Sequence, residues 1–256
     1  MPKQILTALD YILGELYTPD ARHVLVHNLL MQGVVDVPQK HIESLLEHSK
    51  DVEPRKALFY QEIAEKVGRY DIAERLKINY SKWGEQEDRE RELKKEKYHQ
   101  VEGQIRDAND CVKSTLKKEG IEKAIELAES IEDPFVRQDV LYVTACEVLQ
   151  AGFPAKSVEL YEEIGDYTHA AVSANKCGLH EKAIDLFEKA DCYNEAAEIS
   201  YQIGQFERSM KDYEMTAQFD KAMDAAEKAG LFGRALIYRA VIQLMYGYNY
   251  NVLNAN

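Results

Sequence analysis

Small, apolar and polar positions return every thirteen residues between residues 152 and 236. Each unit is counted from its first position. Five residues after that position stands an alanine or a serine, and six residues after it stands an apolar residue, from Val158 in the first unit to Leu236 in the last. The first positions are mostly glycine: Gly152, Gly165, Gly178, Asp191, Gly204, Ala217 and Gly230. Because glycine accepts the left-handed backbone that ends a helix, each unit is predicted to be one helix of about ten residues followed by a short turn.

Two of these first positions are not glycine. Asp191 tolerates a left-handed backbone at modest cost, whereas the methyl group of Ala217 makes it the poorest fit. We therefore expect the junction at Ala217 to close differently from the others or to fray.

A longer period overlies the first. The ninth residue after each first position alternates between large and small: Tyr161, Ala174, Phe187, Ser200, Tyr213 and Ala226. Helices of this length are marginal alone and need neighbours. The alternation predicts an all-α fold, an α-solenoid of antiparallel helix pairs with a 26-residue repeat built from the 13-residue helix-turn unit. The period breaks at Gln243, so a C-terminal capping helix is expected, with Tyr246, Tyr248 and Tyr250 covering the open end or offering a peptide to a partner.

One unit carries a family resemblance. The stretch ANKCGLHEKAIDLFEKA, residues 174–190, resembles the core of a tetratricopeptide repeat, with Ala174, Gly178, Ala183, Phe187 and Ala190 at that family's spacing. Units of 26 residues are shorter than the ~34 of that family and lack its closing proline. They are more similar to the short-helix repeats of coat and intraflagellar-transport proteins. The resemblance covers about residues 119–247 and implies a protein-binding or assembly role, without assigning any functional residue.

The rest of the chain is predicted to be helical but less regular. Residues 1–84 read as an N-terminal helical arm, in which Leu9, Leu13 and Leu16 share one helix face and GRYDIA at 68–73 repeats the glycine-led pattern. Residues 85–118 read as a long charged connector helix, exposed at first and then packed through an apolar stripe. A homodimeric coiled coil is the alternative for this segment. Residues 119–256 form the repeats and their cap.

Composition narrows the choice of partners. Residues 1–119 carry 22 acidic and 20 basic side chains, whereas residues 120–256 carry 23 and 12. The acidic C-terminal half argues against nucleic acid and favours a basic protein segment. The sequence lacks the run of about 20 apolar residues that membrane insertion requires, so no insertion is expected. The four cysteines form no CxxC pair, and we interpret them as structural thiols in a reducing cytoplasm.

The repeats suggest one binding surface. Glu162, Glu188 and Glu214 occupy the same repeat position, and Glu159 and Asp185 lie one turn earlier on two of the helices. Stacking is expected to align these five residues into an acidic ridge that docks a basic segment of another protein. Tyr201, at an otherwise polar position, is expected to add an aromatic contact.

No motif predicts catalysis or a cofactor. His23 and His27 lie four residues apart, which is metal-ligand spacing, but Val24 stands where the HExxH zinc motif needs glutamate. They are therefore only weak metal candidates. The sequence favours a non-enzymatic protein-interaction scaffold; the alternatives are a structural subunit that self-assembles, as a homo-oligomer, and a helical metal protein or enzyme that uses His23 and His27.

Overall fold

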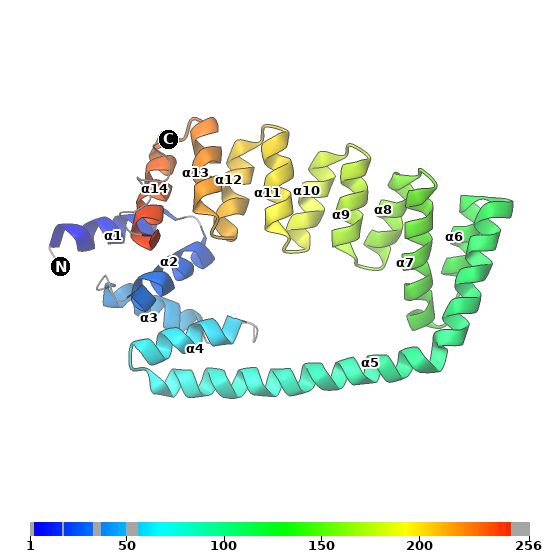
Figure 1. Cartoon of the computed structure of the whole chain (residues 1–256), viewed down its shortest axis with the longest axis horizontal. Helices are drawn as coiled ribbons and strands as arrows, with labels where there is room; N and C mark the ends of the chain where they lie inside the picture. The colour runs from blue at the N-terminus through cyan, green and yellow to red at the C-terminus, as the bar shows by residue number, and fades with distance from the viewer. Residues whose placement is uncertain (1–2, 17, 33–36, 50–55, 247–256) are drawn as a thin grey trace. The chain divides into compact units, whose positions relative to one another are not determined.

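The computed structural model describes residues 3–16, 18–32, 37–49 and 56–246. Within these ranges the chain forms fourteen α-helices and no strand (Figure 1). The predicted all-α class is therefore confirmed. The helices are α1 (Lys3–Glu15), α2 (Pro19–Gln32), α3 (Gln39–His48), α4 (Ala57–Lys66), α5 (Tyr70–Glu119), α6 (Ile121–Glu129), α7 (Pro134–Gln150), α8 (Pro154–Glu163), α9 (Tyr167–Lys176), α10 (His180–Lys189), α11 (Tyr193–Gln202), α12 (Phe206–Met215), α13 (Phe219–Lys228) and α14 (Phe232–Tyr246).

The thirteen-residue units end as the glycines predict. Gly165 has a φ of 76°, and the backbone N–H of Asp166 donates to the carbonyl of Tyr161 at 2.9 Å, which closes the end of α8. The junction at Ala217 closes in the same way, with a φ of 55° and a bond from the Gln218 N–H to the Tyr213 carbonyl at 2.9 Å. The expectation that this junction differs was wrong. Ala217 adopts the same left-handed backbone as the glycines, although this backbone is unfavourable for a residue with a Cβ atom.

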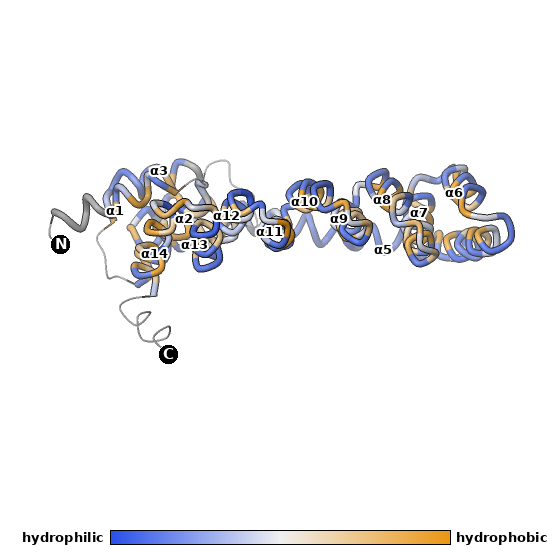
Figure 2. The backbone as a smooth tube through the Cα atoms, turned by 90° about the horizontal axis from the view of Figure 1, so that it is seen from above, coloured by the Kyte–Doolittle hydropathy of each residue, from blue (hydrophilic) through white to orange (hydrophobic). Residues whose placement is uncertain are grey.

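The alternating large and small residues all lie inside. The rings of Tyr161, Phe187 and Tyr213 are 1%, 5% and 5% exposed, and the small residues between them are completely buried. In Figure 2 the short helices α8 to α14 each show hydrophobic and hydrophilic colours, in keeping with one buried side.

The chain divides into two compact units. Unit 1 comprises Met1–Arg91 together with Phe206–Asn256, and unit 2 comprises Glu92–Gln205. In unit 2 the predicted stripe of α5 is confirmed, since Ile105 and Val112 join the core of α6 and α7.

In unit 1 the N-terminal helices pack against α12 and α14. Helix α2 contacts α12 and α14, and α1 contacts α14. The backbone N–H of Thr18 donates to Glu214, and the Arg234 side chain donates to the carbonyl of Glu15. Segments about 200 residues apart thus share one compact unit, an arrangement that the three predicted segments did not contain.

Helix α5 also differs from the predicted connector. It begins at Tyr70 rather than at residue 85 and runs for 50 residues, so that the expected boundary at 84 lies inside it. A Cβ atom at Gly84 or Gly103 would meet nothing within 4 Å, so neither glycine marks a turn or a close approach. Side chains from Arg91 to Gln100 are all exposed, as predicted for the first part of this segment.

The expected tyrosine cap is only partly described. Tyr246, the last residue of α14, is 66% exposed and covers no core. Tyr248 and Tyr250 lie outside the described residues.

Candidate functional site

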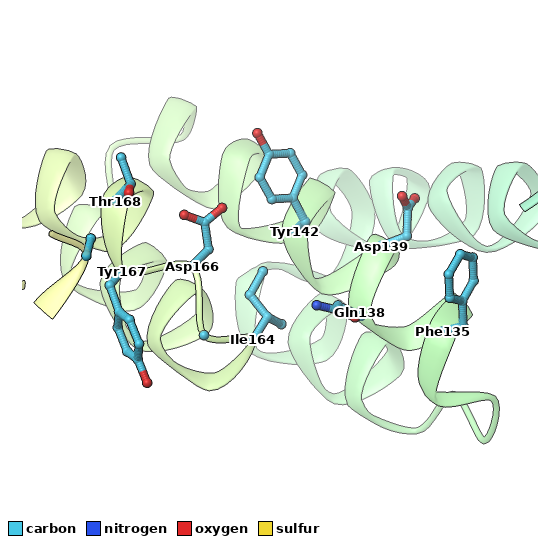
Figure 3. Close-up of a pocket in the computed structure, with 10 residues that line it drawn as sticks. Phe135, Gln138, Asp139, Tyr142, Ile164, Asp166, Tyr167 and Thr168 are labelled. Carbon is cyan, nitrogen blue, oxygen red and sulfur yellow. The ribbon is translucent and has the colours of Figure 1, made fainter. Parts of the chain in front are cut away.

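A cleft of about 560 Å³ opens in unit 2 beside α7 and the turn between α8 and α9 (Figure 3). One wall is a single face of α7, on which Phe135, Gln138, Asp139 and Tyr142 follow one another at intervals of three, one and three residues. Residues 164–168 and Ala190 form the rest of the lining.

The start of α7 is fixed by its own cap. Asp133 accepts hydrogen bonds from the backbone N–H groups of Phe135, at 2.8 Å, and Val136, at 3.3 Å, and Pro134 occupies the first turn. These two bonds lower the pKa of the Asp133 carboxyl, because they favour its charged form. The cap thereby holds the Phe135 end of the cleft in place.

The opposite wall depends on the turn at Gly165. Its left-handed backbone leads into Asp166, which caps α9 by accepting from the His169 backbone N–H at 3.0 Å. The same carboxylate lies 2.8 Å from His169 Nδ1, and His169 Nε2 lies 3.4 Å from the Tyr142 hydroxyl. Since a carboxylate only accepts, Nδ1 donates to Asp166, which leaves Nε2 as the ring atom that faces the Tyr142 hydroxyl. This chain of contacts joins the two walls.

Tyr142, which lines the cleft, packs against two rings that do not line it. The rings of Tyr142, Tyr161 and His169 lie 5.3 to 5.6 Å apart, with Tyr161 stacked on His169 and Tyr142 edge-on to both. The Tyr161 hydroxyl lies 2.9 Å from Cys146 Sγ. Burial raises the pKa of both tyrosines, so they remain protonated hydrogen-bonding groups at neutral pH.

The cleft presents carboxylates and aromatic rings together. In Figure 3 the side chains of Asp139, Tyr142 and Asp166 extend to one side, whereas Tyr167 extends to the other. None of the ten lining residues is basic. Two lysines of the same unit lie over lining rings: Lys97 Nζ is 4.8 Å from the centroid of Phe135, and Lys189 Nζ is 3.9 Å from that of Tyr167. Both rings therefore already engage ammonium groups at the margin of the cleft.

The predicted acidic ridge is distributed over several helices. Glu159 and Glu162 lie on α8, Asp185 and Glu188 on α10, and Tyr201, half-buried, on α11. Two of the carboxylates pair with lysines of their own unit, since Glu159 lies 3.2 Å from Lys156 and Glu162 lies 2.7 Å from Lys182. These contacts reduce the charge that the ridge offers to a partner.

Glu214 does not belong to an exposed ridge. Its side chain is completely buried in unit 1, where it accepts from the Thr18 N–H at 2.9 Å and from the Tyr238 hydroxyl at 2.5 Å. The prediction that it faces a partner was wrong, because the N-terminal helices cover this position of the repeat.

The two histidines have separate partners. His23 is 9% exposed, and its Nδ1 lies 2.8 Å from the Tyr60 hydroxyl. His27 Nε2 lies 3.1 Å from Glu62. Across the residues that the structure describes, no group of three or more His, Cys, Asp or Glu side chains is arranged to hold a metal ion.

The cleft was missed at the level of sequence because its residues straddle the repeat and the helix before it. The i, i+4, i+7 spacing of Phe135, Asp139 and Tyr142 was the available signal, but no pattern placed this face opposite Asp166.

Among the described helices, none is long and apolar enough to cross a bilayer. Comparisons with protein-family models, curated proteins and solved structures give no match to this chain.

Proposed function

We propose that this chain is a non-enzymatic protein-interaction scaffold whose short helices form a tetratricopeptide-like α-solenoid, and that it binds a basic segment of another protein. The observation that carries this proposal is the cleft beside α7, which Asp139 and Asp166 line together with three aromatic rings. The partner's lysine or arginine side chains supply the charge that the lining lacks.

The chemistry of the cleft fits a cationic side chain. A cation over an aromatic ring gains roughly 0.5–1 kcal/mol at an exposed site, and more when water is excluded. The lysines over Phe135 and Tyr167 illustrate this interaction within the chain itself. An exposed ion pair adds up to about 1 kcal/mol and is screened by salt. Binding through several such contacts is therefore expected to be moderate in strength and sensitive to ionic strength.

The cleft and the ridge lead to different outcomes in one experiment. Fluorescence anisotropy with a short labelled peptide of alternating lysine and glycine would measure binding to the wild type and to three variants. Asp139→Lys changes the cleft, Glu188→Lys changes the ridge, and Glu195→Lys alters an exposed position of α11 outside both. Each substitution changes the net charge equally, so a general electrostatic effect would be the same in all three.

We expect Asp139→Lys to weaken binding by about tenfold or more, equivalent to about 1.4 kcal/mol. Glu188→Lys and Glu195→Lys should each change the affinity by less than about threefold, because separated surface charges are screened. An equal loss in all three variants would show non-specific attraction and refute the cleft. A loss confined to Glu188→Lys would place binding on the ridge instead. Circular dichroism of each variant establishes that the helices are intact.

A further inference from the structure

The cleft beside α7 contains one carboxylate that has no partner of its own. Asp166 caps α9 and contacts His169, and Asp133, at the start of α7, accepts from two backbone N–H groups. Asp139 is half-buried, yet it forms no hydrogen bond and no ion pair with any residue that the structure describes. Because a charge that is partly withdrawn from water without a partner costs free energy, Asp139 is the point in the cleft where a cation stabilises the chain most.

The end of α8 adds neutral acceptors to the same cleft. Ile164 and Gly165, which both line it, follow the last turn of α8, and their carbonyl groups accept no backbone hydrogen bond within the described ranges. Carbonyl groups at the C-terminus of a helix carry partial negative charge, which favours a cation. Gln138, exposed on α7, has an amide oxygen that also accepts. The lining residues therefore combine one unpaired carboxylate with several neutral acceptors.

One lining ring is available beside Asp139. Phe135 and Tyr167 each have a lysine ammonium group over the ring, whereas no cation of the described part of the chain lies over Tyr142. Tyr142 follows Asp139 by three residues on α7, and side chains at this spacing are neighbours on the surface of a helix. Figure 3 shows both side chains extending to the same side. A cationic group bound to Asp139 thus lies next to the Tyr142 ring.

We propose that the cleft binds arginine in preference to lysine, with the guanidinium group paired to Asp139 and stacked on Tyr142. This inference rests on the proposed function, because it names the side chain of the basic segment that the cleft accepts. A guanidinium group carries five N–H donors in one plane, and its faces stay free to stack on an aromatic ring. It can therefore donate to Asp139 and to a neutral acceptor while it covers the ring. An ammonium group has three donors and no flat face, so the best position for the carboxylate is not the best position for the ring.

Fluorescence anisotropy of the full chain with two labelled peptides of equal length and equal charge tests the proposal. One peptide alternates arginine with glycine, and the other alternates lysine with glycine. Asp139→Asn keeps the size of the side chain and removes its charge. Asp110→Asn is the matched control, since Asp110 is exposed on α5 in the same unit, lies outside the cleft, and its substitution changes the net charge by the same amount.

In the wild type and in Asp110→Asn, the arginine peptide should bind at least about tenfold more tightly than the lysine peptide. The reason is that a two-bond guanidinium–carboxylate pair with a stacked ring adds to the attraction that both peptides share. In Asp139→Asn the ratio of the two affinities should fall below about threefold. Tyr142→Leu should reduce this ratio in the same way, whereas Tyr142→Phe, which keeps the ring, should retain it.

Equal binding of the two peptides by the wild type, or a preference for the lysine peptide, would overturn this inference and leave the proposed function standing. A preference for arginine that survives in Asp139→Asn would also overturn it, because the discrimination would then come from another part of the chain. If the wild type binds neither peptide at a concentration of about 1 mM, the proposed function is refuted and this inference with it.

Discussion

The buried Glu214 side chain offers a direct test of how unit 1 is held together. Its two carboxylate oxygens accept from Thr18 on the N-terminal segment and from Tyr238 on α14, at 2.9 and 2.5 Å. Replacing Glu214 by alanine removes both acceptors and leaves a small cavity. A buried donor without a partner costs about 1–3 kcal/mol.

The two donors differ in their access to water. Tyr238 is completely buried, so solvent water does not replace the acceptor that it loses, whereas Thr18 is half-buried and can be rehydrated. We therefore expect Glu214→Ala to destabilise unit 1 by about 3 kcal/mol, and Tyr238→Phe to destabilise it by about 1–2 kcal/mol. In a double-mutant cycle the pair should show a coupling free energy of about 1–2 kcal/mol.

Urea unfolding followed by tryptophan fluorescence measures these changes. Trp83 is the single tryptophan of the chain and lies in unit 1, so its signal reports the unit that Glu214 stabilises. Glu227→Ala, at the same repeat position on α13 and exposed in the same unit, is the control and should cost less than about 1 kcal/mol, as surface carboxylates do. A cost for Glu214→Ala as small as that of the control, or a coupling of zero, would show that the buried link is absent.

Two further predictions concern a turn and an ion pair. Ala217→Gly should raise the free energy of unfolding in urea by about 0.5–1 kcal/mol, because the φ of 55° at Ala217 costs a non-glycine residue about 1–2 kcal/mol and the backbone entropy of glycine offsets part of that gain. Gly178→Ala, at a φ of 74°, should lower the free energy of unfolding. Changes of the same sign in both variants would refute the argument. Lys40 and then His41 hydrogen-bond to Asp10 and hold the pKa of its carboxyl below the usual 3.8. The stabilisation from Asp10 is therefore fully present above pH 3.8 and is lost as the pH falls through the lowered pKa of the folded state. Melting temperatures from pH 7 to pH 2 should fall less steeply in Asp10→Asn than in the wild type, and parallel curves would contradict this assignment.

The local features of the repeats were predictable because each follows from nearest-neighbour chemistry. A glycine at a helix end determines the backbone of its own turn. An alanine such as Ala183 packs against the ring of Phe187 on the same helix, one turn away. The burial of Ala183 and Phe187, 0% and 5% exposed, followed from the spacing alone. The start of α5 at Tyr70 was not predicted, since Gly84 looks like a break in sequence but costs only about 1 kcal/mol in a long helix.

The cleft shows a second limit. Asp139 and Asp166 lie on different elements, and their proximity to one opening depends on how α7 packs against α8 and α9. In the periodic pattern Asp166 directly follows Gly165, and its position there gives no sign of a role in a cleft. The capping carboxylate of Asp166 also contacts the His169 ring, which in turn contacts Tyr142. These contacts depend on side-chain geometry, which the spacing of residues in the sequence does not predict.

Glu162, Glu188 and Glu214 show most clearly why equal positions in a repeat need not have equal roles. All three stand ten residues after the first position of their units, and periodicity alone gave them one exposed face. In the structure Glu162 has a side chain 34% exposed and pairs with Lys182, Glu188 is half-buried, and Glu214 is sealed beneath the N-terminal helices. Periodicity encodes the contacts of a helix with its sequence neighbours, whereas the environment of Glu214 is set by Thr18, 196 residues away. A charge-reversal of all three residues would thus combine two surface changes with the burial of a lysine ammonium group, which is costly without a partner. Loss of binding in that triple variant would report unfolding of unit 1 as readily as loss of an acidic surface, so single substitutions in the cleft and on α10 are the informative experiment.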